Sequence, residues 1–147
     1  SLPTGCVIDK ENNIIFSDRG HHTIRKIKRS IPDSFISTIA GTPCNRGSTK
    51  FKFTLPSGVC YDNNGDLIIC DESNRQLCRL DKHGQISTLL IFTDSMINPD
   101  ESKIKPYGYL YPRRIACNLK TGALYVVLRT KILSIIDGSV SCLHTSK

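Results

Sequence analysis

The sequence predicts an all-β protein built from three consecutive units of four short antiparallel strands. The chain repeats its own pattern, with an offset of 53 residues at the start of the repeat and 50 at its end. Within each copy, apolar and polar residues alternate between clusters of turn residues. No segment has the apolar spacing of an amphipathic helix. We therefore expect residues 1–147 to form one all-β domain.

The second copy, residues 55–91, shows the unit most clearly. The segment LPSGVCYDNNGDLIICDESNRQLCRLD, with the residues after it, predicts strands at about 58–62, 66–71, 76–81 and 85–91. Asn64-Gly65 suits a tight hairpin because both residue types tolerate a positive φ. Asp71 closes the second strand, where a short carboxylate can accept hydrogen bonds from loop N–H groups. A structural role is therefore expected for Asp71.

The other two copies follow the same pattern with decreasing fidelity. The first, about 2–41, opens with LPTG where the second has LPSG, and it carries Asp18 at the position of Asp71. The third, about 110–145, opens with YPRRI, so a glycine is missing after its proline. Leu128 also replaces the aspartate in this copy. The third unit is expected to be the least regular of the three.

Tandem four-stranded units of this length are typical of a β-propeller, in which each unit is one blade. The second copy resembles an NHL repeat: Pro-x-Gly, Asp-x-x-Gly-Asp, an apolar triplet, then Asp-x-x-Asn-Arg-x-Leu. The resemblance implies an NHL-type propeller, which normally has six blades. Three blades form an incomplete ring with two bare sheet faces. We expect further blades of a longer protein, or a second copy of the chain, to close it.

Composition and net charge indicate the kind of partner and the cellular compartment to expect. The formal net charge is +7, which suits an acidic partner, and no apolar run is long enough to cross a membrane. Seven cysteines occur without a CxxC motif, so the spacing of a zinc site is absent. We expect reduced thiols, with Cys6, Cys60, Cys70 and Cys117 as core residues of the strands. This predicts an intracellular protein, located in the cytoplasm.

Catalytic motifs are missing, and the two adjacent histidines, His21 and His22, are expected at a loop surface. The resemblance also implies where a catalytic site would lie, because related propeller enzymes bind a metal ion near the ends of their inner strands. Here those strands begin with TGC, SGV and RRI, which contain neither carboxylate nor histidine. We therefore expect a protein that is not an enzyme and has no cofactor or metal site. An enzyme whose site lies in missing blades is the less favoured alternative.

Basic residues are predicted to gather on one face. In a propeller, the loops between second and third strands share a face with the connections between blades. Those segments hold eleven basic and four acidic residues, whereas the opposite hairpins hold four basic and seven acidic ones. Solvated surface loops are the simpler interpretation of this asymmetry. The candidate partner- or RNA-binding residues are Arg19, His22, Arg46, Lys52, Arg75, Arg113, Arg114, Arg129 and Lys131.

The sequence therefore predicts a non-catalytic interaction scaffold that docks a protein partner through its loop faces. The alternative is RNA binding through the same basic face. Stacking platforms for bases would then have to come mainly from the two long connections. The aromatic residues available there are Phe51, Phe53, Phe92, Tyr107, Tyr109 and Tyr111.

Overall fold

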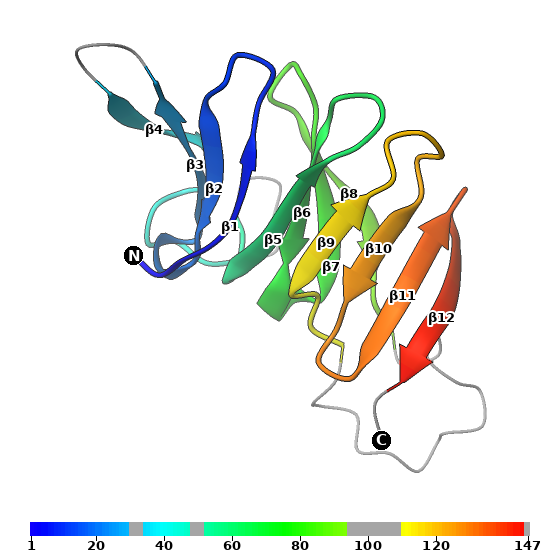
Figure 1. Cartoon of the computed structure of the whole chain (residues 1–147). Helices are drawn as coiled ribbons and strands as arrows, with labels where there is room; N and C mark the ends of the chain where they lie inside the picture. Colours follow the sequence, from blue (N-terminus) through cyan, green and yellow to red (C-terminus); the bar gives the residue numbers. More distant parts are fainter. Residues whose placement is uncertain (30–33, 48–51, 94–109, 146–147) are drawn as a thin grey trace.

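The computed structural model describes residues 1–29, 34–47, 52–93 and 110–145. In this part of the chain, twelve strands form three four-stranded antiparallel sheets, each a meander of consecutive strands (Figure 1). The predicted fold class, three antiparallel blades of an incomplete propeller, is confirmed. The strands are β1 (Pro3–Ile8), β2 (Ile14–Asp18), β3 (Thr23–Lys28) and β4 (Phe35–Ala40) in blade 1; β5 (Pro56–Tyr61), β6 (Leu67–Asp71), β7 (Gln76–Leu80) and β8 (Ile86–Ile91) in blade 2; and β9 (Arg114–Cys117), β10 (Leu124–Val127), β11 (Lys131–Ile136) and β12 (Ser139–Thr145) in blade 3.

The first strands of the blades, β1, β5 and β9, lie side by side, and the sheets fan outward from them (Figure 1). Glycine makes this close approach possible. A Cβ atom at Gly58 would lie 2.8 Å from the Cα of Arg114 and 3.0 Å from the carbonyl oxygen of Arg113. Gly5 meets the backbone of blade 2 in the same way, at Ser57. The glycine of each Pro-x-Gly motif is thus required by contact with the next inner strand.

Blade 2 is apolar on both faces because it is packed between the other two blades. Ile68 and Cys70 point into a core shared with blade 3, and Leu67 and Ile69 point into a core shared with blade 1. All four side chains are buried. This explains why β6 is a continuous apolar run, since the usual polar positions of an alternating strand would face a neighbouring blade here.

One face of blade 1 has no neighbour in the described part of the chain. A row of isoleucines crosses its four strands, in register from one strand to the next: Ile8, Ile14, Ile27 and Ile36. Ile8 is 59% exposed and Ile36 is 52% exposed. The equivalent row of blade 2, Tyr61, Leu67, Leu80 and Ile86, packs in the core against blade 1.

The bare face of blade 1 explains why one of the four cysteines predicted in the core is exposed. Cys6 was expected in the core, yet it is exposed, because it lies on the side of β1 that no blade covers. Cys70 is buried as expected, and Cys60 and Cys117 are half-buried beside it at the core between blades 2 and 3. Burial raises the pKa of the Cys60 thiol to about 12. All seven cysteines are free thiols in the structure.

Asp71 ties its blade to the connection that precedes it. Its Oδ1 accepts the backbone N–H of Thr54, and its Oδ2 accepts the side-chain amides of Asn74 and Gln76, each at 2.7 Å. Burial raises the pKa of Asp71, and these three hydrogen bonds oppose the rise. Asp18, the equivalent residue of blade 1, is also buried. The structural role predicted for Asp71 is confirmed.

Among the described residues, no helical segment has the length and apolarity that a membrane span requires.

Candidate binding site at the channel mouth

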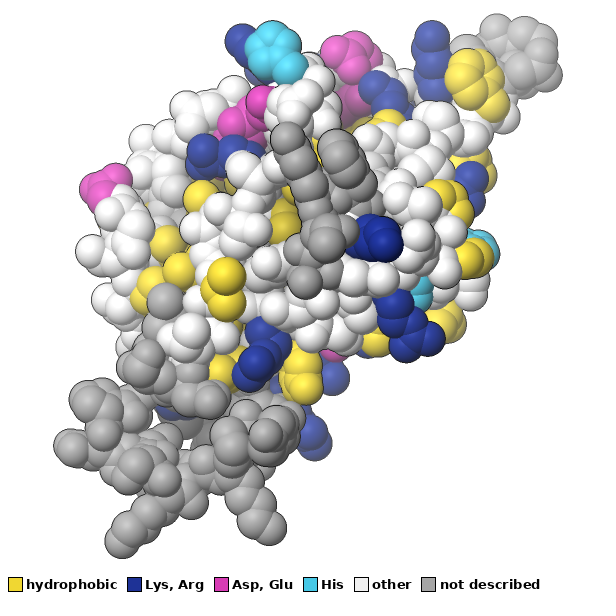
Figure 2. Space-filling model, turned by 180° about the vertical axis from the view of Figure 1, so that it is seen from behind, with side chains coloured by type: hydrophobic (Ala, Val, Ile, Leu, Met, Phe, Trp, Pro, Cys, Tyr) yellow, Lys and Arg dark blue, Asp and Glu magenta, His cyan; other side chains and the backbone are white. Residues whose placement is uncertain are grey.

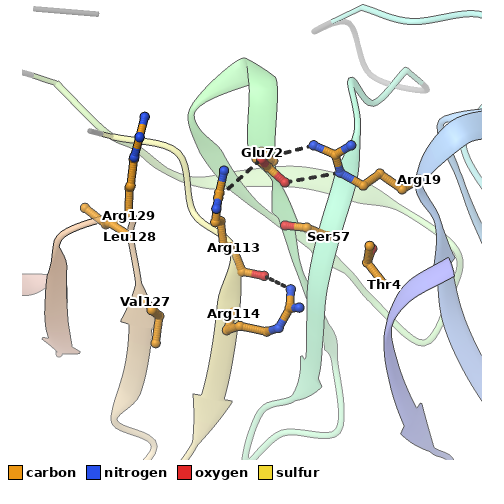
Figure 3. A pocket seen from close by; sticks show the side chains of 9 residues that line it. All are labelled: Thr4, Arg19, Ser57, Glu72, Arg113, Arg114, Val127, Leu128 and Arg129. Atoms are coloured by element: carbon orange, nitrogen blue, oxygen red, sulfur yellow. Dashed lines mark hydrogen bonds and ion pairs between the residues drawn. The ribbon is translucent and has the colours of Figure 1, made fainter. Parts of the chain in front are cut away.

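A shallow cavity of about 490 Å³ opens where the three inner strands begin, on the side of the loops between second and third strands (Figure 3). We call it the channel mouth. All three blades contribute to its lining. The lining residues are Thr4, Arg19, Ser57, Glu72, Arg113, Arg114, Val127, Leu128 and Arg129.

The lining reflects the repeat, because the same two positions of each copy supply most of it. The first is the residue after the proline of the opening motif, which is Thr4, Ser57 or Arg113. The second is the residue after the position of the strand-closing aspartate, and its three occupants are Arg19, Glu72 and Arg129. Arg114 adds a further cation at the place where the other copies have glycine.

Glu72 lies between two arginines from the other two blades. It belongs to the short helical turn η2 (Glu72–Asn74) that follows β6. Its carboxylate accepts hydrogen bonds from Arg19 at 3.2 and 3.4 Å, and it pairs with Arg113 at 3.6 Å (Figure 3). The Glu72 side chain is only 9% exposed. These contacts connect all three blades at the channel mouth, and the sequence interpretation did not single out Glu72.

The two other arginines have no such partner. Both Arg114 and Arg129 are exposed, and neither pairs with a carboxylate among the described residues. The guanidinium of Arg114 donates to the carbonyl oxygen of Arg113 at 3.0 Å. Four arginines and one glutamate thus line the cavity, which leaves it strongly electropositive.

The remaining predicted site residues are more scattered. Arg75 is exposed at the end of η2. Arg46 is exposed and Lys52 is half-buried, and both lie on the connection between blades 1 and 2. Lys131 is buried at the first position of β11. The other charged residues sorted to this face, Lys50, Asp94, Asp100, Glu101, Lys103 and Lys105, lie outside the described residues.

His22 differs from its expected surface position. It is buried, and its Nδ1 accepts the backbone N–H of Leu55 at 3.1 Å. Burial lowers the pKa of His22, and the neighbouring cations Arg46 and Arg19 add to the effect. The imidazole therefore links blade 1 to the start of blade 2 and does not face solvent.

Carboxylates at the opposite end of the blades pair with basic residues of the strands. Asp9 meets Lys26 at 2.8 Å, and Asp62 meets Arg79 at 3.4 Å. Seen from behind, acidic side chains cluster mainly at the upper end, whereas basic ones occur at both ends (Figure 2). Acidic side chains are thus concentrated at the opposite end, whereas the channel mouth is lined by four arginines and one glutamate.

Two aromatic residues proposed as base-stacking platforms are core residues. Phe53 is 1% exposed and Phe92 is 2% exposed, and each belongs to one of the two cores. Neither presents a ring to solvent. Tyr111 is half-buried, and Phe51, Tyr107 and Tyr109 lie outside the described residues. Within the described ranges, no group of three or more His, Cys, Asp or Glu side chains is arranged to hold a metal ion.

Comparison with known proteins agrees with this architecture. Residues 53–80 match the model of the NHL repeat. A search of curated protein sequences found no match. Virginiamycin B lyase from Staphylococcus aureus is similar with a TM-score of 0.64 and 14% identity, and the match covers 99% of this chain and 42% of that chain. A gluconolactonase from Xanthomonas campestris has a TM-score of 0.69 and 13% identity, with 97% of this chain and 47% of that chain covered. An auxiliary nutrient binding protein from Bacteroides ovatus has a TM-score of 0.62 and 14% identity, with 82% of this chain and 33% of that chain covered.

The neighbours overturn the prediction that the protein is not an enzyme. Two of the three are named as enzymes, so this fold is compatible with catalysis. The prediction relied on the residues at the start of three inner strands. The chain spans less than half the length of these neighbours, so three inner strands do not represent a whole channel. At these identities the likeness shows the fold alone: the chain folds as three consecutive blades of a β-propeller, and residues 53–80 of it match the NHL repeat.

Proposed function

We propose that this chain forms the docking section of a propeller, and that its channel mouth binds an acidic segment of a protein partner. The observation that carries the proposal is the gathering of four arginines from two blades around one cavity with a single carboxylate. A basic cleft attracts an acidic segment at long range and then pairs with its carboxylates by charge-assisted hydrogen bonds.

The burial of Phe53 and Phe92 favours a protein partner over RNA. Single-stranded RNA is usually held by stacking of bases on exposed rings, in addition to phosphate contacts. Phe53 and Phe92 are both buried, so these two rings are not available for stacking. An acidic peptide needs only guanidinium groups in an open cleft, and Arg114 and Arg129 provide them.

The test measures binding of a short fluorescein-labelled oligoglutamate peptide to the 147-residue chain by fluorescence anisotropy. The variant is Arg114→Glu with Arg129→Glu, because both side chains are exposed and neither pairs with a carboxylate in the described structure. Loss of two charge-assisted contacts should weaken binding by ~3 kcal/mol, on the order of 100-fold. Binding of the unchanged chain should also fall as salt rises from about 50 to 200 mM.

The matched control is Lys82→Glu with Lys120→Glu. Both lysines are exposed in hairpins at the opposite end of the blades, and the pair changes the net charge by the same amount. The control should bind the peptide like the unchanged chain, apart from a small loss through net charge. Equal losses in the two double variants would refute a localised docking site. Tighter, arginine-dependent binding of oligouridine than of oligoglutamate would replace the protein partner by RNA.

A further inference from the structure

We infer that Glu72 is a positioning residue of the channel mouth. It holds the guanidinium of Arg113 by its Nε atom and leaves the two outer nitrogens, Nη1 and Nη2, to bind a carboxylate of the docked segment. This inference rests on the proposed function and assigns one contact with the acidic ligand to a particular arginine. It begins from the unequal way in which Glu72 shares its carboxylate between blades 1 and 3.

The carboxylate of Glu72 is fixed in place before any ligand binds. Its side chain is only 9% exposed, and it stands on the turn η2, directly after the buried Asp71. Two hydrogen bonds constrain that turn. The backbone N–H of Ser73 donates to the carbonyl oxygen of Thr54 at 3.0 Å, and the side-chain amide of Asn74 donates to Asp71 at 2.7 Å. A carboxylate on so constrained a turn can orient the side chains that pair with it.

Arg19 and Arg113 use this carboxylate differently. Arg19 reaches it with two nitrogens, Nε at 3.4 Å and Nη2 at 3.2 Å, and its side chain is 26% exposed. Arg113 reaches it with Nε alone, at 3.6 Å, and its side chain is 53% exposed. Among the described residues, the outer nitrogens of Arg113 take part in no ion pair. Arg19 is therefore the main counter-charge of Glu72, whereas Arg113 keeps donors for a ligand at the cavity (Figure 3).

The repeat shows that Arg113 occupies a position with another task in blade 2. It follows the proline of the opening motif, where the other two copies have Thr4 and Ser57. Ser57 is buried, and its hydroxyl donates to the carbonyl oxygen of Pro112 at 3.0 Å, which ties one inner strand to the next. In blade 3 a long cation replaces this short hydroxyl and reaches back to Glu72. Blade 3 thus places a half-exposed guanidinium beside the one carboxylate of the lining.

Holding Arg113 by its Nε prepares it for a carboxylate. The guanidinium group is planar, so a contact at Nε also sets the direction of Nη1 and Nη2, whose N–H groups can form two parallel hydrogen bonds with a carboxylate. An unconstrained arginine would lose side-chain freedom on binding, which lowers affinity by about threefold to tenfold. Contact with Glu72 provides that order in the free protein. The negative charge of Glu72 also repels an acidic ligand, but two adjacent cations offset this repulsion.

The test replaces Glu72 by aspartate, which keeps the charge but shortens the side chain by one methylene group. We expect Glu72→Asp to draw the carboxylate away from Arg113 and to weaken binding of the labelled oligoglutamate peptide about threefold to tenfold. Glu11→Asp is the matched control, because it makes the same chemical change at an exposed residue at the opposite end of the blades. The control should leave the affinity unchanged. Fluorescence anisotropy measures binding, well below the melting temperature of each variant.

A double-mutant cycle shows whether Glu72 acts through Arg113. Arg113→Gln alone should weaken peptide binding about tenfold or more, because a charge-assisted contact is lost. In the Arg113→Gln background, Glu72→Asp should have no further effect on affinity, because the residue that it positions is gone. Arg113→Lys should give an intermediate loss, since lysine keeps the charge but not the planar fork.

Three outcomes would overturn this inference and leave the proposed function intact. Tighter binding by Glu72→Asp would mean that Glu72 competes with the ligand for the arginines. A lower melting temperature with unchanged affinity would make Glu72 a structural link between blades and nothing more. A loss that persists in the Arg113→Gln background would show that Glu72 does not act through Arg113.

The double glutamate variant of Arg114 and Arg129 distinguishes failure of the proposed function. If that variant binds the oligoglutamate peptide as its lysine control does, or if the unchanged chain does not bind the peptide, docking at the channel mouth fails, and the role of Glu72 fails with it.

Discussion

Replacing Asp71 by asparagine is the sharpest test of how the blades are held together. The side chain is fully buried, and three donors share its two oxygens, each at 2.7 Å. Asparagine keeps one acceptor oxygen and places an NH₂ group where the other stood. That NH₂ group then faces donors that are themselves N–H groups. We expect Asp71→Asn to destabilise the domain.

The size of the destabilisation follows from the hydrogen bonds that asparagine cannot accept. If asparagine keeps the bond from Thr54, it loses those from Asn74 and Gln76. Rotating the Asn74 amide does not help, because its NH₂ group also donates to the carbonyl oxygen of Gly47. Two hydrogen bonds to a charged group are worth about 1.5–3 kcal/mol each. Removing a buried charge, whose cost is reflected in the raised pKa of Asp71, returns part of this. We expect a net loss of about 2–4 kcal/mol in the free energy of unfolding.

Urea and thermal unfolding, followed by circular dichroism, measure the effect. For a chain of this length the melting temperature should fall by roughly 5–15 °C. The matched control is Asp81→Asn in an exposed turn. Both backbone amides there, of His83 and Gln85, donate to the same oxygen of Asp81, which asparagine retains. The control should melt close to the unchanged chain. A variant of Asp71 within about 0.5 kcal/mol of the unchanged chain would refute the reasoning.

Four further predictions test packing, charge and closure. Gly58→Ala should cost about 1–3 kcal/mol in urea unfolding, since the new Cβ would lie 2.8 Å from the next inner strand; an unchanged midpoint would mean that the strands can separate freely. Burial opposes the ionisation of Asp9, but hydrogen bonds from a lysine and an asparagine outweigh it and lower its pKa to about 2. Its contribution, about 1 kcal/mol at pH 7, should therefore be lost as pH falls from 4 to 2, and the stability gap to Asp9→Asn should close there. The Cys70 thiol, with its pKa raised by burial, should react with iodoacetamide only after unfolding, unlike the exposed cysteines. Light scattering should detect self-association through the bare isoleucine row, relieved by Ile8→Lys with Ile36→Lys; a monodisperse unchanged chain would contradict this.

Strand positions were predictable because they depend on local pattern. The second copy was expected to have strands at about 58–62, 66–71, 76–81 and 85–91. The structure places them at Pro56–Tyr61, Leu67–Asp71, Gln76–Leu80 and Ile86–Ile91. The apolar pattern and the turn residues between the strands determine these positions within the repeat itself. The role of Asp71 followed for the same reason, since its partners lie within 17 residues of it. The two-residue hairpin expected at Asn64-Gly65 was wrong: the connection spans residues 62–66, and of these two residues Gly65 alone has a positive φ, 83°.

Burial was less predictable because it depends on which blade lies against which face. Cys6 and its equivalent in blade 2, Val59, occupy the same position of the repeat, yet only Val59 is covered. His22 and Arg75 are likewise equivalent, but His22 is buried against the next blade and Arg75 is exposed. No property of the residue alone separates the members of such a pair.

The lining of the channel mouth was partly visible in the sequence. Sorting charges by loop placed Arg19 and Arg129 on one face, but it treated Glu72 only as a charge to subtract. Aligning the residue after the second strand in all three copies brings these three together, and the structure confirms that they share one cavity. The contact of Glu72 with arginines of both neighbouring blades needed coordinates, because it joins residues 53 and 41 positions apart.

The irregularity of blade 3 has two different physical consequences. Leu128, which replaces the strand-closing aspartate, is 2% exposed and joins the core shared with blade 2, so packing compensates for the lost hydrogen bonds. Arg114 and Arg129 are exposed and add nothing to that core. They pair with no carboxylate among the described residues, so they contribute little to the stability of the blade. The blade that fits the repeat least well thus keeps its core packing at Leu128 and places these two cations at the channel mouth.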